Sequence, residues 1–261
     1  MLLTLCINIL QESIKISMII CVFGRDSETI KNLIKKFSRN FEEDIIFYNS
    51  KIKEKKPDFA ICVGGDGTLF YAERKLPEVP KIFIKWKGDL RKIRFDRLIE
   101  KILDKEYNIL QIPKIAAFLN KNKKSIKIGI NDINIHYKPP YALRFSLKIN
   151  SKIKKNVIGD GIVVSTPYGS SGYFKSITGK VFREGIGIAF NNPTERIQPI
   201  FINEFFKRNM KIKVYILRGN GFLTADNDTN ILKIKRGDII TIKKYNRNAK
   251  LVKIKGKIIE D

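Results

Sequence analysis

Histidine and cysteine are scarce in this sequence, and their scarcity disfavours two kinds of site. There is one histidine, His136, and the three cysteines, Cys6, Cys21 and Cys62, stand singly without CxxC spacing. So few ligands argue against a zinc cluster. A serine hydrolase is also disfavoured, because it needs a positioned acid beside a histidine base and the fragment GSSG (169–172) lacks the GxSxG spacing.

Long hydrophobic runs are absent as well. No stretch approaches eighteen uninterrupted apolar residues, and the apolar opening MLLTLCINIL is too short to span a bilayer and lacks a basic leader. We therefore expect a soluble chain with no membrane partner. Three unpaired cysteines and no signal peptide predict a reducing, cytoplasmic compartment.

Acidic residues are few beside basic ones. Lys and Arg number 51 against 26 Asp and Glu, a formal net charge of +25. Such an excess favours an anionic partner, which could be nucleic acid, an acidic membrane surface or a phosphorylated small molecule. The lysine-rich runs at 51–56, 121–124 and 152–155 are nevertheless scattered, which favours a solvated surface over one binding stripe.

The pattern of apolar residues predicts two domains. Strand-like runs and helix-like runs alternate up to residue 103: strands at 18–23, 45–49, 59–63 and 81–86, and helices at 26–37, 67–75 and 95–103. This alternation is typical of a parallel sheet with crossover helices. From 108 onward, alternating strand-like runs separated by turn residues dominate. We predict an α/β, Rossmann-like domain over 1–104 and a mostly β, sandwich-like domain over 105–261.

Glycine is concentrated in two places, and the first is the stretch GGDGT (64–68). Ten of the seventeen glycines fall within 64–67 and 159–187. A glycine-rich loop between a parallel strand and a helix exposes backbone N–H groups to phosphate. Asp66 within it could ligate Mg²⁺ or accept a proton from an attacking hydroxyl, as phosphoryl transfer requires. The alternative is a tight turn in which Asp66 only caps the helix.

The second concentration, DGIVVSTPYGSSGYFKSITG (160–179), places hydroxyls and free amides after a short apolar strand. Hydroxyl and amide groups can form hydrogen bonds with the hydroxyls of a sugar and with the edges of a base. Upstream, in SIKIGINDINIHY, the apolar alternation changes phase across Asn131 and Asp132. The phase change predicts a β-bulge that re-aims an amide and a carboxylate toward an adenine edge and a ribose. An ordinary turn between two short strands is the alternative.

Together, the motifs at 64–68, 131–132 and 160–173 resemble the three signatures of the NAD kinase family of prokaryotic and archaeal type. GGDGT alone is shared with diacylglycerol and sphingosine kinases, whereas STPxGSxxY after Asp-Gly is specific to NAD kinases. The resemblance covers nearly the whole chain. It implies phosphorylation of the adenosine ribose 2′-hydroxyl of NAD to give NADP.

The resemblance also implies a role for each matching residue. Asp66 would be the catalytic carboxylate. The groups around the phosphates would be Gly64, Gly65, Gly67 and Thr68. Those that bind NAD would be Asn131 and Asp132 at the adenosine, Asp160 at the nicotinamide end, and Tyr168, Ser171, Gly172, Tyr173, Ser176 and Asn192 around them.

Several positions depart from the family's pattern. Asp132 replaces a glutamate, Tyr168 a small hydroxyl residue that contacts adenine, Ser171 a threonine and Gly172 an alanine. In the family's glycine-rich segment after the fourth strand, here IKWKGDLRKI (84–93), only Gly88 and Leu90 are retained.

We predict an NAD kinase that uses ATP or another phosphoryl donor, with Mg²⁺ or another divalent ion arriving on the triphosphate and no protein metal ligand assigned. We expect a cytoplasmic homo-oligomer without a specific nucleic-acid partner. Two alternatives stay open: a lipid or other small-molecule kinase sharing GGDGT, and a non-catalytic dinucleotide or nucleic-acid binder.

Overall fold

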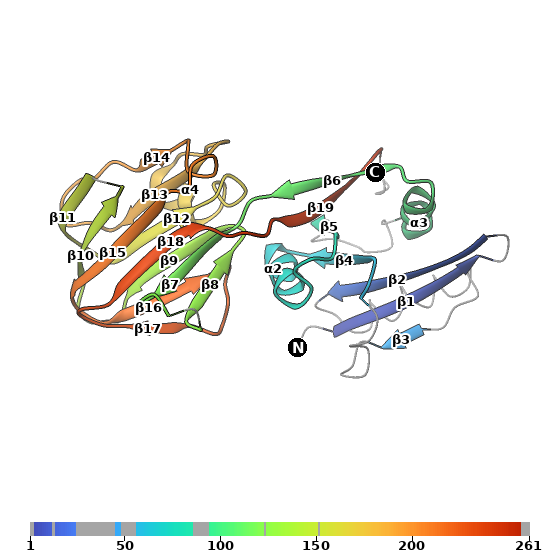
Figure 1. Cartoon of the computed structure of the whole chain (residues 1–261), viewed down its shortest axis with the longest axis horizontal. Coiled ribbons are helices and arrows are strands. Elements are labelled where there is room, and N and C mark those ends of the chain that lie inside the picture. Colours follow the sequence, from blue (N-terminus) through green and yellow to red (C-terminus); the bar gives the residue numbers. More distant parts are fainter. Residues whose placement is uncertain are drawn as a thin grey trace. The chain divides into compact units, whose positions relative to one another are not determined.

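The computed structural model describes residues 3–11, 14–24, 45–47, 56–85, 94–122, 124–150 and 152–256. The chain forms two compact units, whose elements are labelled in Figure 1. The first unit comprises Met1–Gln111 and Ala249–Asp261, and the second comprises Ile112–Asn248. No helix among the described residues is long and apolar enough to cross a membrane.

The first unit is built on a seven-stranded sheet in the order β3-β1-β2-β4-β5-β19-β6. Its strands are β1 (Leu3–Gln11), β2 (Ile14–Gly24), β3 (Ile45–Phe47), β4 (Phe59–Gly64), β5 (Lys81–Lys85), β6 (Tyr107–Ile112) and β19 (Ala249–Ile254), and the helices among its described residues are α2 (Asp66–Lys75) and α3 (Phe95–Leu103). Strands β2, β4, β5 and β19 pair in parallel. Strand β1 pairs antiparallel with β2 and β3, so the sheet is mixed.

The apolar runs read from the sequence form the centre of this sheet. Strand β4, FAICV with its following glycine, is buried along its length until Gly64, as expected for a parallel strand covered on both faces. Helix α2 packs on β2, β4 and β5 through Leu69, Phe70 and Ala72. The predicted α/β class is thus confirmed, while the helix predicted at 26–37 lies outside the described residues.

The hairpin of β1 and β2 was not predicted, and it bears on the cysteines. In its antiparallel register, Cys6 and Cys21 are Cα partners. Cys21 is disulfide-bonded, and Cys62 is a free, buried cysteine. The expectation of three unpaired cysteines is therefore wrong, because sequence spacing gives no sign of cross-strand neighbours.

The second unit consists of two six-stranded sheets with a helix. One sheet runs β11-β10-β15-β18-β7-β8 and the other runs β14-β13-β12-β9-β16-β17. The elements are β7 (Ile115–Leu119), β8 (Ile126–Gly129), β9 (Asp132–Tyr137), β10 (Leu143–Ile149), β11 (Lys152–Gly159), β12 (Gly161–Ser165), α4 (Tyr173–Thr178), β13 (Ile186–Asn191), β14 (Ile200–Ile202), β15 (Lys211–Arg218), β16 (Gly221–Ala225), β17 (Leu232–Ile234) and β18 (Ile239–Lys244).

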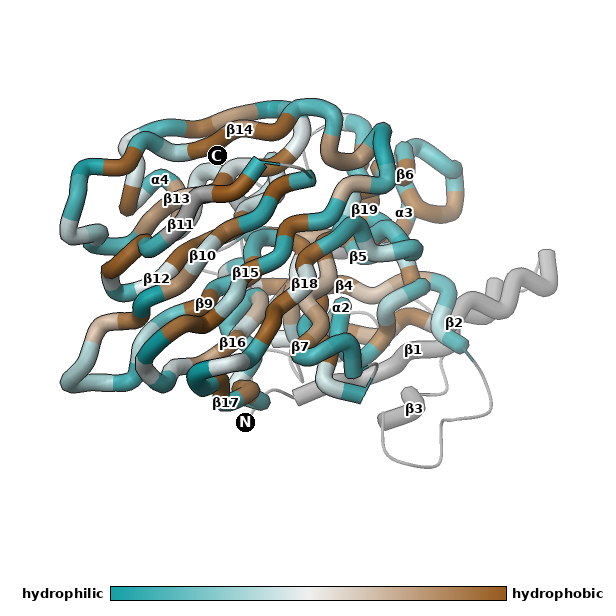
Figure 2. Tube along the Cα trace, turned by 60° about the vertical axis from the view of Figure 1, so that its left-hand side comes forward, coloured by the Kyte–Doolittle hydropathy of each residue, from teal (hydrophilic) through white to brown (hydrophobic). Residues whose placement is uncertain are grey.

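Side chains from both sheets form one apolar core, which includes Ile133 and Ile162 from one sheet and Phe145 and Val214 from the other. Apolar and polar residues alternate along β10, β15 and β18, as Figure 2 shows. This alternation turns one face of each strand toward the core. The predicted sandwich-like domain is confirmed.

The predicted boundaries, 1–104 and 105–261, differ from the two units. The second unit begins at Ile112, because β6 still belongs to the first sheet. The segment 249–261 returns to the first unit, where β19 pairs in parallel with β5 through Leu251 and Val252. A strand-like run does not reveal which sheet it will join, so the return was not visible in the sequence.

Candidate active site

The GGDGT loop joins β4 to α2. Gly64 has a φ of +141°, and a Cβ there would lie 2.8 Å from Thr68 Oγ1. Gly65 is the N-cap of α2, and Asp66 is the first helical residue. The alternative in which Asp66 caps the helix is therefore not observed. A Cβ on Gly65 or Gly67 would meet no atom within 4 Å, so the backbone is open to a ligand there.

The carboxylate of Asp66 is paired with a lysine that the sequence analysis did not single out. Lys85 Nζ donates to both Asp66 oxygens, each at 3.0 Å. The two side chains are 42% and 61% exposed for Asp66 and Lys85. Because β4 and β5 are parallel, both residues stand at the carboxyl edge of the sheet, where open α/β sheets bind ligands.

The residues that pack under the GGDGT loop are buried and therefore not accessible to ligands. Thr68 is buried, so a phosphate at the loop would meet its backbone rather than its hydroxyl. Lys81 of β5 forms a buried ion pair with Glu73 of α2 and donates to the Leu76 carbonyl. Burial raises the pKa of the Cys62 thiol to about 12, which leaves it protonated and unsuited to nucleophilic catalysis.

In the second unit, Asn131 and Asp132 lie where the chain crosses from one sheet to the other. Strand β8 pairs with β7, whereas β9 pairs with β12 and β16. The predicted β-bulge is wrong, and the alternative of a turn between two short strands is correct. The apolar alternation changes phase because β8 and β9 belong to different sheets.

One carboxylate holds this turn in place. Asp226, buried after β16, accepts hydrogen bonds from the backbone N–H groups of Ile130, Asn131 and Asp132 at 2.5, 2.8 and 3.2 Å. Burial, followed by the nearby charge of Asp132, raises the pKa of Asp226 to about 7, and burial raises that of Asp132 to about 6. Asp226 does not stand out in the sequence, since polar residues are common in turns.

The loop after β12 holds the same turn from its other side. The Thr166 N–H and the Ser165 hydroxyl donate to the Asn131 carbonyl at 2.8 and 3.2 Å. Thr166 Oγ1 donates to the Ile130 carbonyl. A Cβ on Gly169 would lie 2.3 Å from the Asn131 carbonyl oxygen, so only glycine allows this approach.

The structure therefore brings two of the sequence motifs together. A Cβ on Gly172 would lie 3.7 Å from Asn131 Nδ2. Among the described side chains, Asn131 Oδ1 is the buried polar atom that has no hydrogen-bond partner. A buried acceptor without a donor is costly unless a ligand completes it, so this amide is a candidate for binding an exocyclic amino group.

Asp160 and Tyr173 are each hydrogen-bonded to one of two consecutive asparagines. Asn192 Nδ2 donates to Asp160 Oδ2 at 3.2 Å, and the neighbouring Asn191 Nδ2 donates to the Tyr173 hydroxyl at 3.0 Å. Ser176 in α4 donates to the Gly172 carbonyl at 3.4 Å. Asn191 was missed, although the pair of asparagines in AFNNP was a usable signal.

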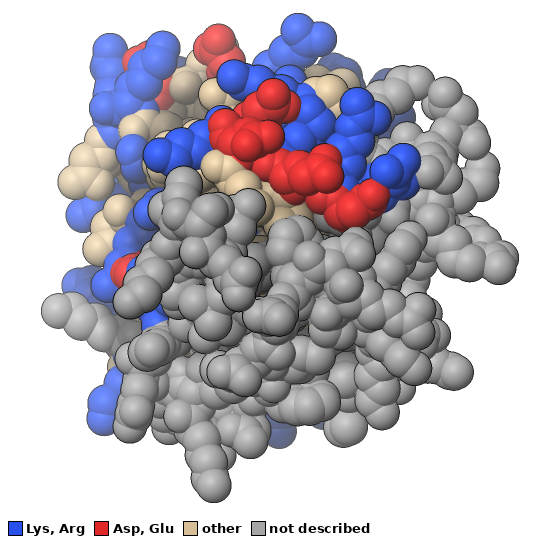
Figure 3. Space-filling view, turned by 90° about the vertical axis from the view of Figure 1, so that its right-hand side faces the viewer, with Lys and Arg blue, Asp and Glu red and all other residues tan. Residues whose placement is uncertain are grey.

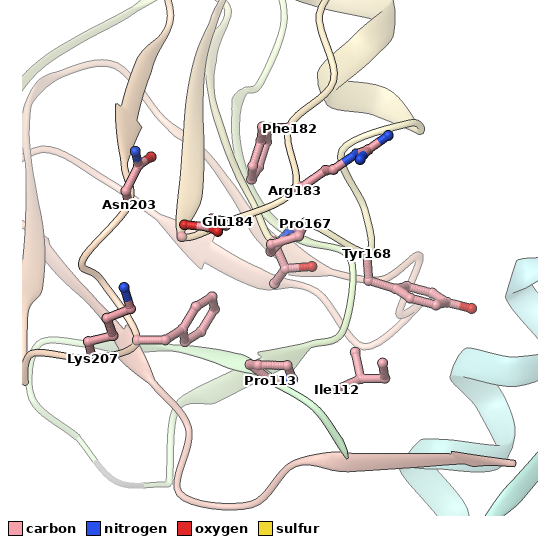
Figure 4. Close-up of a pocket in the computed structure, with 12 residues that line it drawn as sticks. Ile112, Pro113, Pro167, Tyr168, Phe182, Arg183, Glu184, Asn203 and Lys207 are labelled. Carbon is pink, nitrogen blue, oxygen red and sulfur yellow. The ribbon is translucent and has the colours of Figure 1, made fainter. Parts of the chain in front are cut away.

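Tyr168 and Ser171 lie in the loop between β12 and α4. Ser171 is exposed. Tyr168 lines a cavity of about 530 Å³ within the second unit, where its ring extends beside Ile112 (Figure 4). The cavity is lined by Ile112, Pro113, Thr166, Pro167, Tyr168, Phe182, Arg183, Glu184, Gly185, Asn203, Phe206 and Lys207.

The described residues contain no group of three or more His, Cys, Asp or Glu that could hold a metal ion.

On the face drawn in Figure 3, basic side chains lie in several separate places beside a contiguous acidic group. On that face the described charges are mixed, unlike the continuous basic stripe typical of nucleic-acid binding.

Comparison with known proteins identifies the family. The model of the ATP-NAD kinase C-terminal domain matches residues 130–254. The NAD kinase of Ruminiclostridium cellulolyticum is 30% identical over 216 residues, covering 77% of this chain and 74% of the relative. That of Saccharolobus islandicus is 27% identical over 193 residues, covering 71% and 69%.

Among solved structures, an NAD kinase from Archaeoglobus fulgidus in complex with ATP superimposes with a TM-score of 0.68 at 22% identity, covering 90% of this chain and 93% of that one. At this identity the likeness concerns the fold. Together with the sequence relatives, it shows that the chain belongs to the NAD kinase family.

Proposed function

We propose that this chain is an NAD kinase that transfers the terminal phosphoryl group of ATP to the adenosine ribose 2′-hydroxyl of NAD, giving NADP and ADP. The observation that carries the proposal is the exposed carboxylate of Asp66 in the glycine loop of a chain from this family. A carboxylate among phosphate-binding amides repels its ligand unless it takes part in the reaction.

In the first unit, the open backbone at Gly65 and Gly67 would donate N–H groups to the phosphates, aided by the positive end of the α2 dipole. Asp66 would accept the proton of the 2′-hydroxyl as the hydroxyl oxygen attacks the phosphorus. Gly64 and Thr68 would set the shape of the loop, because Thr68 is buried against Gly64.

In the second unit, Asn131 and Asp132 would bind the adenosine part of NAD, with the amide toward the base and the carboxylate toward ribose hydroxyls. The fixed turn supports this assignment, since Asp226 holds three consecutive N–H groups. Asp160 and Asn192, with Tyr173, Gly172 and Ser176, would bind the nicotinamide end. Tyr168 and Ser171 would contact the dinucleotide at its edge.

A divalent ion, proposed as Mg²⁺, would arrive with the triphosphate. Mg²⁺ prefers oxygen ligands and is usually bound by one or two carboxylates together with substrate phosphates. Asp66 is the carboxylate at the loop, and its side chain is 42% exposed. When bound, the ion neutralises negative charge on the phosphates.

We also propose that the chain works as a homo-oligomer in the cytoplasm, where its proposed substrates are metabolised. Light scattering of the purified chain and fractionation of cells that produce it test these two statements.

The function is tested by incubating the purified chain with NAD, Mg²⁺ and each donor in turn, and measuring NADP by chromatography. We expect NADP with ATP, and a loss of turnover on the order of a hundredfold or more in Asp66→Asn, with NAD binding nearly intact. Phosphorylation of diacylglycerol instead of NAD would refute the proposal. Unchanged turnover in Asp66→Asn would remove Asp66 from the chemistry.

A further inference from the structure

Lys85 lies beside the phosphate loop, and it is neither of the two residues, Gly88 and Leu90, that the segment 84–93 retains from the family's pattern. It is the last residue of β5 and the Cα partner of Gly64, the first glycine of the loop. Its ammonium therefore stands beside GGDGT at the carboxyl edge of the sheet, 3.0 Å from each oxygen of Asp66.

Stability does not account for this pair. Both side chains are largely exposed, at 61% for Lys85 and 42% for Asp66, and exposed pairs contribute little to folding. The attachment of α2 to β5 is already provided by the buried pair of Lys81 and Glu73. An exposed cation that neutralises the proposed base therefore needs another explanation.

The geometry of phosphoryl transfer explains why a cation lies beside Asp66. A general base lies about 3 Å from the hydroxyl oxygen it deprotonates, and that oxygen lies about 3–3.5 Å from the phosphorus it attacks. The transferred group must then lie within about 7 Å of the Asp66 carboxylate. Lys85 already has its Nζ 3.0 Å from that carboxylate, at the end of a flexible four-carbon chain.

The charge of Lys85 also suits a position beside the transferred phosphoryl group. The transition state of phosphoryl transfer spreads negative charge over three equatorial oxygens, and cations stabilise it. An ammonium with three donors can exchange a carboxylate for phosphoryl oxygens without leaving the site. The exchange also frees the carboxylate to accept a proton.

We propose that Lys85 binds the γ-phosphate of ATP, leaving Asp66 as the triphosphate enters and stabilising the transferred phosphoryl group. This inference rests on the proposed function. In the step, the bond from the ribose 2′-oxygen to the γ-phosphorus forms as the bond from that phosphorus to the bridging oxygen of ADP breaks. The hydroxyl proton passes to Asp66.

Two variants test the proposal against a matched control. Lys85→Met removes the ammonium, and Lys85→Arg keeps the charge. The control is Lys56→Met, because Lys56 forms an ion pair with Glu78 in the same unit at 3.0 Å, with exposures of 59% and 47%. Affinities for ATP and for ADP are measured by calorimetry with Mg²⁺ present, beside steady-state rates of NADP formation.

We expect Lys85→Met to weaken ATP binding roughly 10- to 100-fold and to leave ADP binding within about twofold, since only ATP has the γ-phosphate. Lys85→Arg should restore part of the ATP affinity, and the control should behave as the parent chain. Equal losses for ATP and ADP, or no loss for either, would overturn the proposal. Absence of NADP formation by the parent chain would refute the proposed function instead, and the comparison of ATP with ADP still decides the role of Lys85.

Discussion

At the scale of single residues, the Asn131-Asp132 turn depends on a carboxylate almost a hundred positions away. Asp226 accepts three consecutive backbone N–H groups and is itself buried. An acceptor placed in this way fixes the backbone from which the two proposed adenosine ligands project. Asp226 is therefore a positioning residue for that part of the proposed site.

The raised pKa values of this carboxyl pair predict how stability changes with pH. Burial raises the pKa of Asp132 to about 6 and that of Asp226 to about 7, from an ordinary value of 3.8. Between about pH 4 and pH 7, these two carboxyl groups then bind more protons in the folded chain than in the unfolded chain. The free energy of unfolding contributed by these groups should fall as pH rises through that window, by on the order of 5 kcal/mol.

Asp226→Asn isolates the contribution of Asp226, because an amide does not titrate. Urea denaturation at pH 5 and pH 8 should show a smaller fall in the variant than in the parent chain, with Glu204→Gln, an exposed carboxylate, as the control. The variant should also raise the KM for NAD about tenfold and leave that for ATP unchanged, since its NH₂ group opposes a backbone N–H. Equal falls in the two chains and an unchanged KM for NAD would contradict this role.

At the scale of elements, the position of α2 decides where Asp66 stands. The helix begins at Asp66 and is attached to β5 by the buried pair of Glu73 and Lys81. Its apolar face, with Leu69 and Phe70, packs on the sheet. The ion pair adds a buried polar contact between the helix and β5.

Breaking the pair at one end should destabilise the chain strongly. We expect Lys81→Met, which leaves Glu73 buried without its cation, to lower the free energy of unfolding by about 3–5 kcal/mol. Lys81→Met combined with Glu73→Leu should recover much of the loss, because no buried charge is left. Urea denaturation measures both. A double variant no more stable than the single one would show that the pair does more than neutralise charge.

At the scale of the whole molecule, the chain crosses between its two units twice. The first unit is completed by β19, which follows the entire second unit in sequence and pairs with β5. Strand β5 carries both Lys81 and Lys85, so the last strand supports the strand that holds the phosphate loop in place.

A fragment ending at residue 111 should therefore fold poorly. Joining 249–261 to it through a Gly/Ser linker of about ten residues should restore a cooperative thermal transition, because β5 regains its neighbour. Circular dichroism compares the two, and a scrambled 249–261 segment on the same linker serves as the control. Equal transition temperatures for the bare fragment and the repaired one would contradict the prediction.

Local pattern in the sequence determined a large part of this protein. The run FAICV predicted β4, because burial on both faces selects a continuous apolar run, and the helix expected after that strand and its glycine loop, at 67–75, is α2. Motif chemistry at GGDGT and at STPYGSSGY indicated the family that the relatives then showed.

Only the tertiary structure decided which distant residues meet. Lys85 joins Asp66 because two parallel strands align their carboxyl ends, and Asp226 reaches Asn131 because β16 pairs with β9. The return of β19 and the change of sheet between β8 and β9 have the same origin. Periodicity reports which face of a strand is buried, whereas pairing between strands depends on long-range packing that no local window contains.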